Sequence, residues 1–199
     1  MNASWLLALF GFAIAASITP GPNNIMVAAS AARHGIAATF SHIIGICVGF
    51  AGMIFLVGLA MEGVAAEIAT IAAAVRWVGL AWLLLLAWRI ASAPPPGEGH
   101  VRPPMRFLGG AVFQWVNPKA WLLALAASAV FVQPARGPVL PQLLVIVAVF
   151  FLVSLPSTLF WAALGSNAAR LLTSPGRLRA FNVVMAILLV ASMVPAVIE

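Results

Sequence analysis

The chain has 199 residues, of which 64% are hydrophobic and only 7% are charged, and its mean hydropathy is +1.12. Apolar runs of this extent exclude an ordinary soluble domain and predict an integral membrane protein. The formal net charge of +6 could indicate nucleic-acid binding, but the basic residues stand in short connectors between apolar runs. In such places they set the orientation in a membrane, so we expect no nucleic-acid partner.

Residues typical of catalytic and metal sites are scarce. The chain has four glutamates, no aspartate and one cysteine, Cys47, so it offers neither paired carboxylates within an apolar run nor a cysteine-based metal cluster. It also lacks a glycine-rich phosphate loop. We therefore expect neither an enzyme nor an ATP-driven pump, and we expect no cofactor and no bound metal.

Six apolar runs follow one another, each close to the roughly 20 residues that a helix needs to cross the hydrocarbon. They cover residues 5–28, 38–60, 68–88, 107–131, 140–164 and 180–198. The sequence therefore predicts an all-α integral membrane protein with six transmembrane helices. The longest connector, residues 91–106, is rich in proline and divides a first three-helix repeat, 1–90, from a second, 107–199.

The arginines are distributed unevenly between the connectors. Seven fall in the first, third and fifth connectors: Arg33, Arg89, Arg102, Arg106, Arg170, Arg177 and Arg179. The second and fourth connectors carry only Arg136, with Arg76 ambiguous near the start of the third run. Because cytoplasmic connectors carry the excess of basic residues, we expect the N-terminus and the C-terminus outside.

Two of the six runs contain residues that interrupt an α-helix. The first holds Thr19-Pro20-Gly21-Pro22-Asn23-Asn24 and the fourth holds Asn117-Pro118-Lys119. Proline lacks the backbone N–H and clashes with the preceding turn. In lipid, the freed backbone groups are tolerated only where they are buried in protein or line a cavity. We therefore expect helices 1 and 4 to be broken at mid-membrane, and we expect the breaks to mark a binding site.

The two breaks belong to an internal repeat. A shift of about 98 residues aligns Gly11 with Gly109 and Pro20 with Pro118, and it also aligns two short alanine-rich stretches. Since each half has three helices, the second half would insert in the opposite orientation, which is the inverted-repeat plan of secondary transporters. Chance similarity between two alanine-rich helices is the alternative.

Each break is expected to start a second half-helix whose N-terminus opens inside the membrane. Asn117-Pro118 is a helix start, and either Gly21-Pro22 or Thr19-Pro20 can serve in the first half. Helix N-termini present free N–H groups and about half a positive charge, and Lys119 adds a full charge nearby. We predict that these groups hold a carboxylate, the alternative being a lysine that extends to the membrane interface.

Further polar residues are candidates for the same cavity. With the breaks included, the predicted substrate-binding residues are Thr19, Pro20, Gly21, Pro22, Asn23, Asn24, Gln114, Asn117, Pro118, Lys119, Ser154, Ser157 and Thr158. For the hydroxyls, the alternative is a hydrogen bond to the preceding turn of their own helix. His42 is a candidate proton carrier, and an interfacial or hydrogen-bonded histidine is an equal alternative. The glycines at 45, 49 and 52 predict close packing of the second helix.

Several motifs together resemble a known family. They are the two break motifs, His34-Gly35, the region around Gly45 and Gly49, Leu86-Ala87-Trp88-Arg89-Ile90, and Trp115-Val116 ahead of the second break. In these motifs and along its whole length the chain resembles the lysine-exporter/homoserine-threonine-resistance (LysE/RhtB) family. The resemblance implies a bacterial inner-membrane exporter of amino acids or close relatives, driven by an ion gradient, in particular the proton-motive force. The Asn-Asn after Pro-Gly-Pro is most similar to the exporters of cysteine and O-acetylserine.

One position departs from the family's pattern. Many members carry an aspartate in the fifth helix, about where Ser154 stands here. Without it, a dication such as lysine would have an uncompensated charge in a low-dielectric site, so we expect a small, neutral amino acid. The candidates for proton coupling are then His42, Lys119 and the substrate's own amine.

Two other functions stay open. A metal-ion exporter can also have paired helix breaks, but these helices lack the carboxylates or soft ligands that a cation site needs. A non-transporting membrane protein, acting in binding or assembly, would have its breaks packed shut. The expected partners are an amino-acid substrate and membrane lipid, and the glycines of the second helix offer a surface for a homodimer.

Overall fold

The computed structural model describes residues 2–61, 63, 65–92, 103–171 and 174–194. Most of the predicted 91–106 connector, with Arg102, and the end of the predicted sixth helix lie outside the described residues. Within the described residues the chain forms α-helices and 3-10 helices and no β-strand, which confirms the all-α class. They are α1 (Ala3–Ile18), α2 (Pro22–Ala60), α3 (Ala65–Ala91), α4 (Phe107–Phe113), η1 (Gln114–Val116), α5 (Pro118–Phe131), η2 (Pro134–Arg136), α6 (Val139–Leu171) and α7 (Pro175–Ala191).

The helices have the length and composition of a helical membrane protein. Within the part of the chain that the structure describes, three stretches are long and apolar enough to cross a membrane: Pro22–Ala60, Thr70–Ala91 and Val139–Ala168. Shorter apolar helices cover Ala3–Ile18, Phe107–Val116 and Pro118–Phe131, and these flank the two predicted breaks. The predicted first and fourth spans are therefore each divided into two shorter helices.

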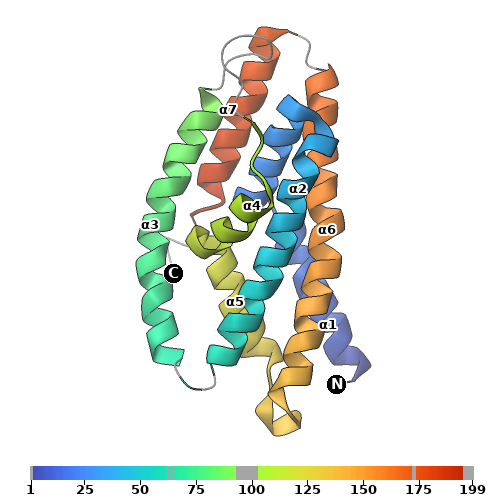
Figure 1. Cartoon of the computed structure of the whole chain (residues 1–199), viewed down its shortest axis with the longest axis vertical. Helices are drawn as coiled ribbons and strands as arrows, with labels where there is room; N and C mark the ends of the chain where they lie inside the picture. Colours follow the sequence, from blue (N-terminus) through green and yellow to red (C-terminus); the bar gives the residue numbers. More distant parts are fainter. Residues whose placement is uncertain (1, 62, 64, 93–102, 172–173, 195–199) are drawn as a thin grey trace.

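The long α2 consists of two helices joined at a sharp turn. Gly35 has φ 80° and ψ 166°, a backbone conformation that glycine adopts readily and other residues rarely. Ser30 Oγ and Thr39 Oγ1 lie 3.0 Å apart, whereas nine residues of straight helix would span about 13.5 Å. The chain therefore reverses here, and the predicted first connector is this turn (Figure 1).

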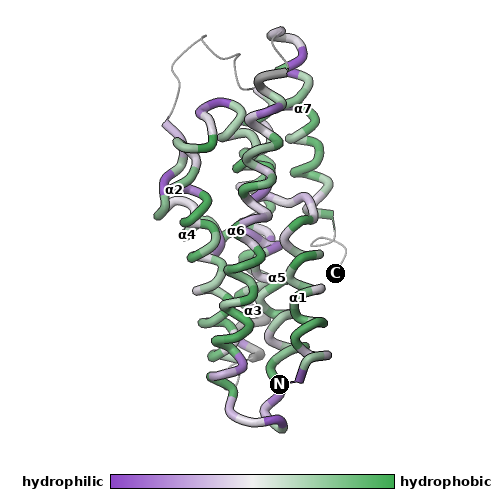
Figure 2. The backbone as a smooth tube through the Cα atoms, turned by 90° about the vertical axis from the view of Figure 1, so that its right-hand side faces the viewer, coloured by the Kyte–Doolittle hydropathy of each residue, from purple (hydrophilic) through white to green (hydrophobic). Residues whose placement is uncertain are grey.

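The helices form one elongated bundle. α6 packs against α1 and α2, α4 packs against α2, and α3 packs against α7. The turn in α2, the end of α3 and the start of α7 lie near one end of the bundle, whereas the start of α1 and η2 lie near the other (Figure 1). Hydrophilic segments gather at both ends and also at mid-height (Figure 2). The turn in α2 with Arg33, the end of α3 with Arg89 and the start of α7 with Arg177 and Arg179 thus share one end, which the predicted orientation requires; the orientation itself stays a prediction.

Glycines allow α2 and α4 to approach each other closely. A Cβ at Gly45 would lie 2.1 Å from the carbonyl oxygen of Phe107, and one at Gly49 would lie 2.5 Å from Cα of Ala111. The close packing predicted for these two glycines is therefore confirmed. The prediction is wrong for Gly52, where an added Cβ would meet no atom within 4 Å.

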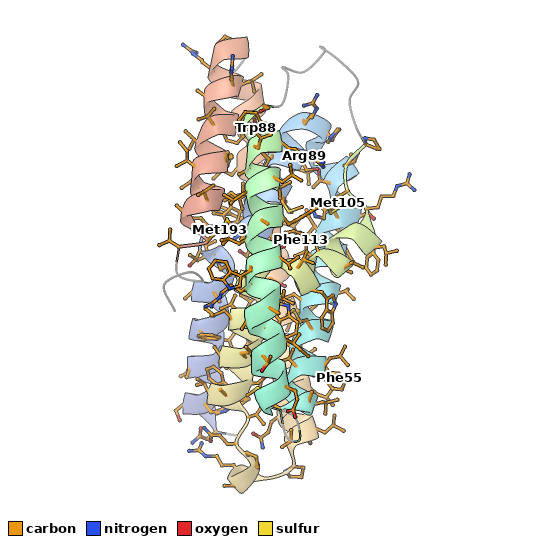
Figure 3. All side chains as sticks on the ribbon, turned by 90° about the vertical axis from the view of Figure 1, so that its left-hand side faces the viewer. Phe55, Trp88, Arg89, Met105, Phe113 and Met193 are labelled. Atoms are coloured by element: carbon orange, nitrogen blue, oxygen red, sulfur yellow. The ribbon has the colours of Figure 1, made fainter. Side chains whose placement is uncertain are left out.

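Two apolar clusters enclose the middle of the bundle. One joins α1, α2, α5 and α6 and contains Leu9, Trp121 and Phe150. The other draws on α2, α3, α4, α6 and α7, and Figure 3 shows two of its members, Phe113 and Met193, on opposite sides of α3. Residues next to both breaks belong to these clusters: Ile25 and Phe113 to the second, and Ala120 and Trp121 to the first.

Candidate functional site

The first break is three residues long. α1 ends at Ile18, Thr19 has φ −59° and ψ 132°, and α2 begins at Pro22. Gly21 is the N-cap in an extended conformation (φ −169°, ψ 175°), and no side chain caps the new helix. Of the two starts that the sequence left open, Gly21-Pro22 is therefore the one used, and proline occupies the first turn where its missing N–H costs nothing.

The second break is confined to one residue. The 3-10 helix η1 ends at Val116, Asn117 is extended (φ −93°, ψ 106°), and α5 begins at Pro118. Asn117 Oδ1 accepts the backbone N–H of Lys119 at 3.2 Å, and its carbonyl oxygen accepts the N–H groups of Ala120 and Trp121. The predicted Asn-Pro helix start is thus confirmed. Its first N–H groups, however, are already bonded within the break.

Side chains from other elements satisfy the carbonyl oxygens that the first break frees at the end of α1. Asn24 Nδ2 donates to the carbonyl of Ser17 at 2.8 Å and to that of Thr19 at 3.0 Å. Ser157 Oγ donates to Ser17 at 2.8 Å, and Trp161 Nε1 donates to the carbonyl of Ile18 at 3.2 Å. Since a buried carbonyl without a partner is costly, these donors stabilise the break.

Lys119 extends from α5 to the same carbonyl oxygens. Its Nζ donates to Thr19 at 3.0 Å and to Pro20 at 3.3 Å. The C-terminal end of a helix carries partial negative charge, so the end of α1 stabilises the ammonium. A Cβ at Gly21 would lie 2.9 Å from both Cδ and Nζ of Lys119, so glycine leaves the space that the lysine occupies.

A pair of amides joins the two breaks directly. Asn23 Nδ2 donates to Gln114 Oε1 at 2.8 Å, and Gln114 Nε2 donates to Asn23 Oδ1 at 3.1 Å. Gln114 Nε2 also donates to the carbonyl of Gly110 at 2.8 Å, and the Gln114 side chain is fully buried. This reciprocal pair ties the start of α2 to η1.

A cavity that is partly open to solvent lies against both breaks, between α1, α2, α5 and α6, and its empty space with the open solvent included is about 460 Å³. Its lining combines polar residues with the apolar side chains of Ile46, Phe50 and Leu123, here called the apolar wall. The lining residues are Ala16, Ser17, Gly21, Pro22, Asn23, Asn24, Ile46, Phe50, Asn117, Lys119, Ala120, Leu123, Ser154 and Thr158. Lys119 is the one lining residue with an ionisable side chain.

The structure brings together most of the predicted substrate-binding residues. Those that line the cavity are Gly21, Pro22, Asn23, Asn24, Asn117, Lys119, Ser154 and Thr158. The others do not line it: Thr19, Pro20 and Ser157 contribute to the bonded end of α1, and Gln114 and Pro118 to the second break. Whether these residues bind substrate stays a prediction.

The hydroxyls of α6 make two kinds of hydrogen bond: some bond within their own helix, and one bonds to another helix. Ser154 Oγ donates to the carbonyl of Phe151 at 3.3 Å, and Thr158 Oγ1 donates to the carbonyl of Ser154 at 2.7 Å, as in ordinary bonding to the preceding turn. Ser157 instead bonds across to α1. α6 stays helical through Pro156.

His42 is separated from the cavity. It is almost fully buried against Gly110 of α4, it does not line the cavity, and neither ring nitrogen has a hydrogen-bond partner among the described residues. Nor do the described residues gather three His, Cys, Asp or Glu side chains into a group that could hold a metal ion.

Sequence reasoning missed Trp161 and the apolar wall. Trp161 follows Ser157 by one helical turn, so the two share a face of α6, and this spacing was a usable signal. Ile46, Phe50 and Leu123 look like any other core position in an apolar chain, and no local pattern distinguishes them.

Comparison with known proteins agrees with this architecture. The family model described as "LysE type translocator" matches residues 14–197. The "Cysteine/O-acetylserine efflux protein" of Escherichia coli (strain K12) is 30% identical over 194 residues, which cover 96% of each chain, and that of Shigella sonnei (strain Ss046) has the same identity and coverage. No solved structure matches. The chain therefore belongs to the LysE type translocators, a family of membrane transporters and not of enzymes.

Proposed function

We propose that this protein exports small, neutral amino acids or their derivatives across the bacterial inner membrane by secondary active transport, driven by an ion gradient, with protons as the coupling ion. The observation that carries the proposal is the cavity against the two breaks, in a chain whose relatives are named as efflux proteins for cysteine and O-acetylserine. Because the cavity lining combines polar groups with an apolar wall, it suits a small zwitterion with a short side chain.

The start of α2 is the better of the two anion sites. Asn117 already engages the first N–H groups of α5, whereas no side chain caps α2. Asn23 and Asn24 are the first residues of α2 with backbone N–H groups, and both line the cavity. Two hydrogens of the Lys119 ammonium are bonded to carbonyl oxygens. The end of the Lys119 side chain lies beside Gly21, the N-cap of α2, so it can donate to a carboxylate bound there.

The lining favours a neutral substrate. It contains no aspartate or glutamate, and Ser154 and Thr158 occupy the α6 side of the cavity. A second positive charge on the substrate would therefore enter a low-dielectric site without a compensating anion. Lysine and arginine are expected to be poor substrates for this reason.

The helix contacts support an arrangement of two inverted three-helix repeats, residues 1–90 and 107–199. α1 packs against α6, and its counterpart α4 packs against α2; α3 and α7, the last helices of the two halves, pack against each other. The half-helix starts Pro22 and Pro118 are 96 residues apart, close to the shift that aligns the two halves. In this arrangement both termini face outside and the halves rock around the cavity.

The test is efflux from cells preloaded with labelled cysteine, O-acetylserine, threonine, homoserine, leucine, lysine or arginine. Faster loss of a neutral compound, abolished by an uncoupler and by Lys119→Ala, is expected. Gly52→Ala is the control, because a methyl group there meets open space. Faster loss of lysine or arginine would contradict the neutral-substrate proposal, and no flux of any compound would contradict the exporter itself.

A further inference from the structure

We propose that the carbonyl oxygens at the C-terminal end of α1 form a site for a single cation, which the ammonium of Lys119 and the ammonium of the substrate occupy in turn. Lys119 is then the proton carrier of the exporter. This inference rests on the proposed function. It goes further in assigning a subsite for the substrate's amine, and it explains how an exporter without a carboxylate in its cavity exchanges a proton for a zwitterion.

The broken helix presents both charges that a zwitterion needs. The end of α1 carries partial negative charge and the start of α2 carries partial positive charge. Only Thr19, Pro20 and Gly21 separate them. An α-amino acid has its ammonium and carboxylate on one carbon, so these two neighbouring helix ends match its size. The end of α1 is occupied in this structure by Nζ of Lys119, bonded to the carbonyl oxygens of Thr19 and Pro20.

The carbonyl oxygens at the end of α1 are the strongest site for the substrate's ammonium beside the cavity, because they carry the partial negative charge of a helix end. No carboxylate lines the cavity, and the hydroxyls of Ser154 and Thr158, which donate to carbonyl oxygens of α6, offer only uncharged acceptors. Two ammonium groups on the same carbonyl oxygens would repel strongly in a site of low dielectric. Binding of one cation therefore requires that the other leave or lose its charge.

Among the described residues that line the cavity, Lys119 is the one ionisable group. α1 and η1 carry none, and Arg33 and His34 stand beside Gly35 at the turn of α2 and do not line the cavity. On α2, Cys47 contacts Thr158 and His42 packs against Gly110, and on α3, Arg76 lies over the ring of Trp77. None of these three lines the cavity. The proton exchanged on substrate binding is therefore assigned to Lys119.

The exchange balances in protons and charge. The substrate's ammonium keeps its own protons and bonds to the carbonyl oxygens of Thr19 and Pro20, while Lys119 gives one proton to water and stays as a neutral amine. On the outer side, water of higher acidity returns a proton to Lys119, which takes back the carbonyl oxygens and displaces the substrate. One proton thus enters for each zwitterion that leaves, as antiport requires.

The experiment measures protons released when purified, full-length protein binds ligand in weakly buffered solution with a pH indicator. L-cysteine and O-acetyl-L-serine are expected to bind with release of up to one proton each, as linkage requires. N-acetyl-L-cysteine keeps the carboxylate and thiol but has no ammonium, so it is expected to release none. Lys119→Arg, which stays cationic, is expected to bind cysteine at least tenfold more weakly because the site stays filled.

Lys119→Met tests the same assignment in vesicles. It has no proton to release, and its residual exchange of labelled cysteine is expected to be insensitive to an imposed pH gradient that drives the wild type. Gly52→Ala is the matched control for expression and insertion. Cysteine binding without proton release, or equal release from Lys119→Arg, would overturn the inference while leaving the exporter in place. Absence of wild-type binding and of wild-type flux for every probe would overturn both.

Discussion

The backbone groups freed at the two helix breaks find their hydrogen-bond partners in different ways. The second break is local, since Asn117 caps its own helix and Trp121 Nε1 donates to the carbonyl of Trp115, six residues away, at 3.0 Å. The first break depends on residues far along the chain. Ser157 and Trp161 reach it from α6, and Lys119 reaches it from α5.

The difference indicates which break forms the site. A locally capped break has few polar groups left for a ligand, whereas a break held by side chains can exchange one of those side chains for a ligand. The amide pair between Asn23 and Gln114 joins the two regions, so movement at the first break must involve the second. The following variants test this comparison.

The largest effect on stability is expected for Asn24→Leu. The variant keeps the volume but removes the amide that donates to the carbonyls of Ser17 and Thr19. The free energy of unfolding should fall by about 2 kcal/mol, because two buried hydrogen bonds are lost. Reversible unfolding in mixed detergents measures it. Asn182→Leu in α7 is the matched control, with an expected change within about 0.5 kcal/mol.

A smaller effect, on transport, is expected for Gly21→Ala. The added methyl group would lie 2.9 Å from Nζ of Lys119 and would push the ammonium off the carbonyl oxygens. The initial export rate should fall by roughly tenfold, equivalent to about 1.4 kcal/mol, and labelled efflux measures it. Wild-type export by Gly21→Ala would show that the position of Lys119 does not matter.

The sequence predicts the local features of this fold well. Proline and glycine interrupt a helix through their own covalent structure, so both breaks and the Asn117 cap follow from neighbouring residues. The turn in α2, the end of α3 and the start of α7, which carry arginines, likewise lie near one end of the bundle in Figure 1.

Features that depend on tertiary packing were not predictable in the same way. Nothing near Gln114 indicates that Asn23, 91 residues earlier, will be its partner. Lys119 was expected to contribute a positive charge for a carboxylate, and this stays a prediction. No local pattern indicated that its ammonium would bond to the carbonyl oxygens of Thr19 and Pro20, since this depends on the end of α1 lying beside it. The six-helix inverted repeat stays a proposal for the same reason.

The free energy of unfolding is expected to fall by about 1 kcal/mol in Asn117→Ala. The substitution removes a helix cap while the backbone keeps its hydrogen bonds. Asn117→Asp should retain most of the stability because its carboxylate can accept the same N–H. The detergent unfolding used for Asn24→Leu measures both. If Asn117→Ala lowers the free energy of unfolding by more than Asn24→Leu does, the stability depends more on the second break than on the first, contrary to this comparison.

The smallest effect is expected for two tryptophan variants, one at each break. Trp161→Phe and Trp121→Phe each remove one indole N–H from a backbone carbonyl, that of Ile18 or of Trp115, and each should cost about 0.5 kcal/mol of stability. Of the two tryptophans, only Trp161 bonds to the end of α1, so only Trp161→Phe should also slow export, by about twofold. Unfolding and labelled efflux, measured on both variants, separate the two effects. Equal slowing of export by both would mean that the second break contributes to the site as much as the first does.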